Sequence, residues 1–96
     1  MVEDQRDSAP VELLCIYPTR ILGSDGVEYA ARAYGQPRID GTWIGWFEFG
    51  AVDGTRTVIT GSETTQPNRQ AVAYWASGIE PLYLEGAYAR ANPQAG

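Results

Sequence analysis

Apolar and polar residues alternate along the first two thirds of the chain, with the period of two that is typical of strands. The alternation falls into four stretches, 11–17, 27–35, 42–50 and 56–60. The stretches are separated by three Asp-Gly dipeptides, Asp25-Gly26, Asp40-Gly41 and Asp53-Gly54. Because Asp-Gly tolerates the positive φ angles of tight hairpin turns, the pattern predicts a four-stranded antiparallel meander over residues 11–61.

The hydrophobic spacing changes to that of a helix after residue 64. Its apolar stripe consists of Val72, Trp75 and Ala76. The spacing predicts a helix over 66–77, with Thr65 as its N-cap and Pro67 in its first turn. Gly78 is predicted to end this helix in the left-handed conformation, with Ile79 closing a hydrophobic contact after it.

Residues 81–91 fit two elements. The stripe Leu84, Ala87, Tyr88 and Ala91 is that of a helix, whereas Leu82 to Glu85 also fit a short strand. We favour an extended entry at Pro81-Leu82 into a short helix. The predicted fold class is therefore α+β, a four-stranded antiparallel β-meander followed by one or two C-terminal helices packed on one face.

The length fits a single domain over 11–91, whose helical part covers 64–91. Residues 1–10 and 92–96 are polar, with a proline in each, and are predicted to be a flexible arm and a flexible tail.

The C-terminal half contains Glu63-Thr64-Thr65-Gln66-Pro67, followed by Tyr74-Trp75-Ala76-Ser77-Gly78-Ile79-Glu80-Pro81 and Tyr83-Leu84-Glu85-Gly86-Ala87. This block resembles one in short uncharacterised bacterial hypothetical proteins. The resemblance implies a bacterial single-domain protein and brings no activity, cofactor or binding residue with it.

Strand parity assigns two faces to the hairpin of 27–35 and 42–50. A five-residue loop 37–41 would pair Arg32 with Trp46, so that the arginine could lie over the indole ring. On the other face small residues oppose large ones, as in Ala31 opposite Phe47, which is the pattern of a core under a helix.

The face away from this core carries Arg32, Tyr34, Ile44, Trp46 and Glu48. We interpret it as a candidate interface, because exposed aromatic patches commonly mark interaction sites. Two explanations stay open: residues 81–91 or the N-terminal arm cover this face within one chain, or a second chain covers it.

The charged residues exclude several kinds of chemistry. The seven basic residues are all arginine, and the chain has no histidine and no lysine, which excludes Ser-His triads, His-ligated metals and Schiff-base lysines. Twelve acidic residues give a net charge of −5, which argues against nucleic acid as a partner. The turn aspartates lack the spacing of a calcium loop, so no metal, cofactor or catalytic residue is predicted.

Thr64, Thr65 and Arg69 are a weak candidate for an anion site, because a helix N-terminus presents free N–H groups. Helix capping is the simpler interpretation of the same residues.

The lone Cys15 is interpreted as a buried thiol rather than a nucleophile, and no apolar run reaches the length of a membrane span. With its acidic N-terminus, the chain is expected to be cytoplasmic and not bound to a membrane.

The sequence therefore favours a non-catalytic protein-interaction or self-associating module whose partner is itself, as a homodimer, or an unknown protein. The alternative is a small-molecule binder or small enzyme that uses carboxylate, arginine and hydroxyl groups.

Overall fold

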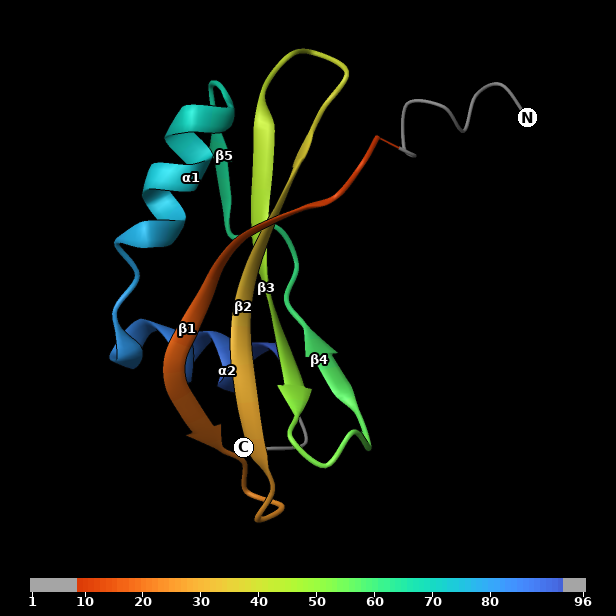
Figure 1. Ribbon diagram of the computed structural model, residues 1–96, viewed down its shortest axis with the longest axis vertical. Helices are drawn as coiled ribbons and strands as arrows, with labels where there is room; N and C mark the ends of the chain where they lie inside the picture. The colour runs from red at the N-terminus through yellow and green to blue at the C-terminus, as the bar shows by residue number, and fades with distance from the viewer. Residues whose placement is uncertain (1–8, 93–96) are drawn as a thin grey trace, which may run out of the picture.

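The computed structural model describes residues 9–92; most of the predicted arm and tail lies outside them. The elements, in chain order, are β1 (Glu12–Leu22), β2 (Glu28–Pro37), β3 (Trp43–Ala51), β4 (Thr57–Ile59), β5 (Thr64–Gln66), α1 (Arg69–Ser77) and α2 (Pro81–Ala91). The strands form one antiparallel sheet in the order β1-β2-β3-β4, and β5 also pairs with β3 (Figure 1). The two helices follow the strands, which confirms the predicted α+β meander.

Each Asp-Gly pair forms the turn of a hairpin, as predicted. Gly26, Gly41 and Gly54 all have positive φ angles, between 79° and 91°. The aspartate before each glycine accepts a hydrogen bond from the backbone N–H two residues further on, at 3.0 Å in all three turns. The same local chemistry therefore builds all three turns.

The register of the β2–β3 hairpin differs from the prediction by two residues. Gly41 N–H donates to the Arg38 carbonyl and Arg38 N–H to the Thr42 carbonyl, so the loop is shorter than expected. Arg32 lies opposite Glu48, and Tyr34 lies opposite Trp46. The predicted stacking of Arg32 on Trp46 is therefore wrong. Because side chains alternate with a period of two, a register shift of two residues leaves each side chain on the same face of the sheet. Both faces therefore keep the residues assigned to them.

Strand β1 continues past Pro18, where the sequence predicted an end. The register shifts between Ile16 and Arg20, which places Pro18 in an irregular stretch of an edge strand. A proline is tolerated there, because edge strands and bulges are the places in a sheet that accept one.

Helix α1 begins at Arg69, later than predicted. The Asn68 side chain accepts a hydrogen bond from Ala71 N–H at 2.9 Å and is the N-cap. Thr65 pairs with Ile44 in β5, so its assignment as N-cap is wrong, and Pro67 precedes the helix. The predicted cap failed because Thr64, Thr65 and Asn68 are all residue types that can cap a helix, and β5 takes both threonines into the sheet.

The end of α1 also differs from the prediction. Gly78 has φ −100° and ψ 6°, and its N–H donates to the Trp75 carbonyl at 3.2 Å. The left-handed conformation predicted for Gly78 is therefore wrong; the helix tightens at its last turn instead.

Helix α2 starts at Pro81 itself, without the extended entry that the sequence favoured, because a proline is well suited to the first helical position. Asn92, predicted to lie in the tail, is buried, and its amide donates to the Tyr88 hydroxyl at 2.9 Å. The packed domain therefore extends to Asn92.

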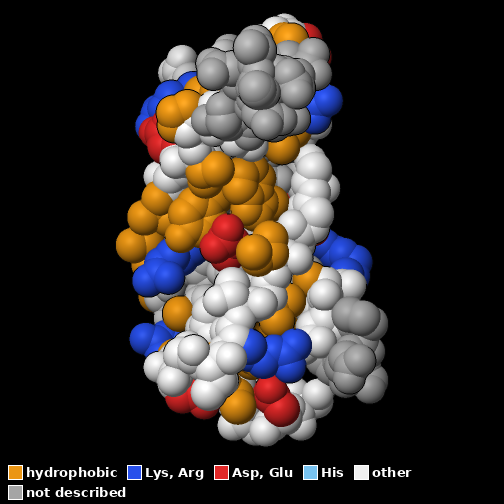
Figure 2. Space-filling view, turned by 90° about the vertical axis from the view of Figure 1, so that its right-hand side faces the viewer, with side chains coloured by type: hydrophobic (Ala, Val, Ile, Leu, Met, Phe, Trp, Pro, Cys, Tyr) orange, Lys and Arg blue, Asp and Glu red, His pale blue; other side chains and the backbone are white. Residues whose placement is uncertain are grey.

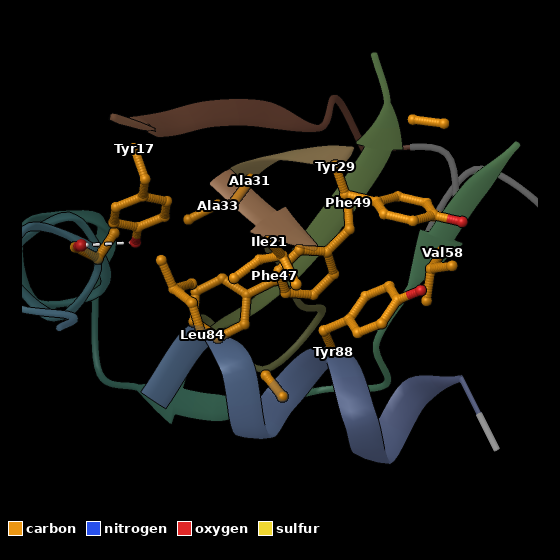
Figure 3. Close-up of a cluster of buried hydrophobic side chains, with 13 residues drawn as sticks. Tyr17, Ile21, Tyr29, Ala31, Ala33, Phe47, Phe49, Val58, Leu84 and Tyr88 are labelled. Carbon is orange, nitrogen blue, oxygen red and sulfur yellow. Dashed lines mark hydrogen bonds between the residues drawn. The ribbon is translucent and has the colours of Figure 1, made fainter. Parts of the chain in front are cut away.

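Both helices pack on one face of the sheet, where the core lies (Figure 3). Its largest fully buried side chains are Tyr29, Phe47, Phe49, Leu84 and Val72. The Tyr17 hydroxyl donates to the Ala76 carbonyl at 2.6 Å and ties β1 to α1. Neither helix of residues 9–92 is long and apolar enough to cross a membrane.

Candidate protein-contact face of the sheet

The sheet face away from the helices, called the open face from here on, carries the residues that the sequence marked as a candidate interface. Arg32 and Tyr34 project from β2, and Ile44, Trp46 and Glu48 from β3, because cross-strand partners share a face. Leu84, Ala87 and Tyr88 of α2 are buried in the core on the opposite face. The alternative in which residues 81–91 cover the open face is therefore wrong.

An aromatic pair lies near the centre of the open face. The rings of Tyr34 and Trp46 stack with their centroids 6.4 Å apart and an interplanar angle of 23°. The Trp46 indole N–H lies 3.4 Å from a carboxylate oxygen of Glu48. Both residues are partly buried, so part of this aromatic surface remains accessible.

Edge strands extend the apolar surface on both sides. Ile16 of β1 lies beside Arg32 and is 61% exposed, and Ile59 of β4 lies beside Glu48 and is 55% exposed. Leu13 lies beside Tyr34. On the side of the molecule that carries β4, hydrophobic side chains gather in one patch with acidic and basic groups at its border (Figure 2).

The sequence prediction of the site omitted Ile16, Ile59 and Leu13. Strand alternation could have placed Ile59 on the open face, since its two neighbours in sequence, Val58 and Thr60, are both buried. The irregular stretch in β1 hid Leu13 and Ile16, because strict alternation fails across a bulge.

One end of the open face meets the start of the described chain. The Gln36 amide donates to the Ala9 carbonyl at 2.6 Å, which fixes residue 9 beside β2. Of the predicted arm 1–10, residues 1–8 lie outside those described, and Ala9 is the part that is held at this face.

The anion-site candidate is not assembled around a helix N-terminus. Thr64 and Thr65 lie in β5, before Asn68 caps the helix. Arg69 forms an ion pair with Glu12 of β1, which lowers the pKa of that carboxyl through the hydrogen bond from the guanidinium. This arginine therefore holds α1 against β1.

A second cluster joins the residue before β5 to α2. Glu63 accepts hydrogen bonds from the Tyr83 hydroxyl at 2.8 Å and from the Arg90 guanidinium at 2.9 Å. The hydrogen bond to Glu63 raises the pKa of Tyr83. Beside this cluster lies a shallow groove of about 580 Å³, lined by Ile79, Leu82, Tyr83 and Arg90 among others. Because Glu63 accepts hydrogen bonds from both polar side chains, we interpret the cluster as a structural contact that fixes α2.

The described residues hold no cluster of three metal-ligating side chains. Within residues 9–92 every buried side-chain nitrogen and oxygen has a hydrogen-bond partner. In comparisons with protein-family models, curated proteins and solved structures, nothing was found to match this chain.

Proposed function

We propose that this chain is a non-catalytic protein-interaction module that binds its partner through the open face. The observation that carries the proposal is the position of both helices on the other face, which leaves the Tyr34–Trp46 pair without a covering helix. Tryptophan, tyrosine and arginine together are the residues most enriched at interface hot spots.

The size of the open face suits a protein partner. Strand β2 has 10 residues and four strands lie side by side, so the face measures roughly 33 by 19 Å. Its flat area of about 600 Å² becomes larger when side-chain relief is included, and an ordinary stable interface buries about 800 Å² of accessible surface per partner. The proposed compartment is the cytoplasm, since Cys15 is a lone thiol and no disulfide depends on an oxidising environment.

Site-specific photo-crosslinking tests the proposal. A benzophenone amino acid in place of Trp46, in living cells that express the full chain, should give covalent protein adducts upon irradiation. The control carries the same group at Tyr74 of α1, an aromatic side chain that is 81% exposed and lies on the helical side. Adducts at position 46 that are absent at position 74 support the proposal. No adduct at position 46, or equal adducts at both positions, overturns it.

A further inference from the structure

The open face has a chemical symmetry that points to its partner. Four residues at the same height form a row across the sheet: Ile16 on β1, Arg32 on β2, Glu48 on β3 and Ile59 on β4. Read in either direction, the row begins and ends with an exposed isoleucine and carries one basic and one acidic residue between them. We call it the Arg32 row.

A two-fold axis would match this row with a second copy of itself. Consider an axis parallel to β2 and β3 and midway between them, just above the open face. Such an axis keeps the height of each residue along the strands and exchanges β2 of one copy with β3 of the other. Since Arg32 and Glu48 are cross-strand partners at the same height, each arginine then lies over the glutamate of the other copy.

The same operation matches the neighbouring residues. Tyr34 lies over Trp46 of the other copy, because these two are also cross-strand partners. Ile16 lies over Ile59 of the other copy, at the two edges of the Arg32 row. Sheets that pack face to face lie about 10 Å apart with strands crossing at about 30°, so the match is closest near the axis.

We propose that the partner is a second copy of this chain, packed face to face about this axis, with Arg32 of each copy paired to Glu48 of the other. The inference rests on the proposed function and names the partner of the same surface. A closed two-fold interface needs a surface complementary to itself, and the Arg32 row meets that condition in its charges and in its terminal isoleucines. The opposite charges of Arg32 and Glu48 favour this arrangement of the two copies, since like charges in contact at an interface are strongly unfavourable.

Charge reversal provides a sharp test. In Arg32→Glu two acidic residues would face two acidic residues, and in Glu48→Arg two basic residues would face two basic residues. Each variant alone should self-associate at least ten-fold more weakly than wild type by sedimentation over about 1–100 µM chain. Mixed in equal amounts, the two variants should form a heterodimer, because every facing pair then has opposite charges.

The controls are charge reversals away from the open face. Arg56→Glu, at the third hairpin turn, and Glu85→Arg, on α2, change the net charge equally at exposed residues. Both should dimerise like wild type. If a single open-face variant fails to fold, the double variant Arg32→Glu/Glu48→Arg decides, because it restores opposite charges and should dimerise as wild type does.

Three results would overturn the inference: a wild-type chain that remains monomeric throughout the series, a mixture of the two folded single variants that remains monomeric, or single variants that dimerise as well as wild type. Crosslinking at position 46 distinguishes a failure of the two-fold dimer from a failure of the proposed function. Adducts with the mass of two chains support both. Adducts with another protein, together with a monomeric wild type, overturn the second copy as partner and leave the proposed function standing.

Discussion

Two glycines show how strongly the effect of one methyl group depends on its surroundings. A Cβ on Gly45 would lie 2.8 Å from a ring carbon of Trp75 and 3.1 Å from a methyl group of Val72. A Cβ on Gly78 would meet nothing closer than 3.9 Å, and its backbone needs no left-handed conformation. Glycine is required at the first position by helix–sheet contact and is dispensable at the second.

We therefore expect Gly45→Ala to lower the free energy of unfolding by about 1–3 kcal/mol, because it overpacks the contact between β3 and α1. Gly78→Ala is expected to be neutral or to stabilise by about 0.4–1 kcal/mol, since alanine restricts the unfolded chain. Urea unfolding of both variants measures the two effects. A loss of about 1 kcal/mol in Gly78→Ala would mean that this residue is left-handed in solution after all.

At the scale of elements, the start of α1 depends on one side chain. Asn68 supplies the cap, whereas Thr65 belongs to β5 and is exposed. Asn68→Ala should cost about 0.5–2 kcal/mol of unfolding free energy through loss of the hydrogen bond to Ala71 N–H.

Thr65→Ala is the matched comparison for this cap. As a surface substitution away from the cap, it should change the unfolding free energy by less than about 0.5 kcal/mol. A larger loss of stability in Thr65→Ala than in Asn68→Ala, measured by thermal or urea unfolding, would place the start of the helix at Thr65.

At the scale of the whole molecule, the three turns together make stability depend on pH. Hydrogen bonds from the threonine two residues on lower the pKa of Asp40 and of Asp53, with the side-chain bond as the largest cause. In Asp25 the largest cause is the backbone N–H of Val27. A carboxyl with a lowered folded-state pKa stabilises the fold above its unfolded pKa, which is about 3.9, and loses that contribution as pH falls through the folded value.

The urea midpoint of wild type should therefore fall as the pH is lowered from about 5 to about 2.5. Asp53→Asn keeps an oxygen that can accept from Thr55 but does not titrate. Its midpoint should lie below that of wild type at neutral pH, and the gap should narrow as the solution is acidified. A gap that stays constant over this range would show that ionised Asp53 contributes nothing to the pH dependence.

The sequence by itself determined the four strands of the meander, the turns between them and the two faces of the sheet. Alternation places Ala31 and Phe47 inward and Tyr34 and Trp46 outward, and a register shift of two leaves that division unchanged. The positive φ at Gly41 was readable because Asp-Gly is a local signal that needs no distant partner. The five predicted residues of the candidate interface were found because strand alternation is also a local signal.

Only the tertiary structure decided how these pieces meet. The incorporation of Thr65 into the sheet depends on its pairing with Ile44, which is distant in sequence, so local cap preference could not reveal it. The side of the sheet taken by α2 depends on packing against Tyr29 and Phe49, and that choice leaves the open face uncovered by the helices. The alignment of Ile16, Arg32, Glu48 and Ile59 in one row likewise needs the register of three strand pairs, because a side-chain pattern fixes the face of a residue but not its height along the sheet.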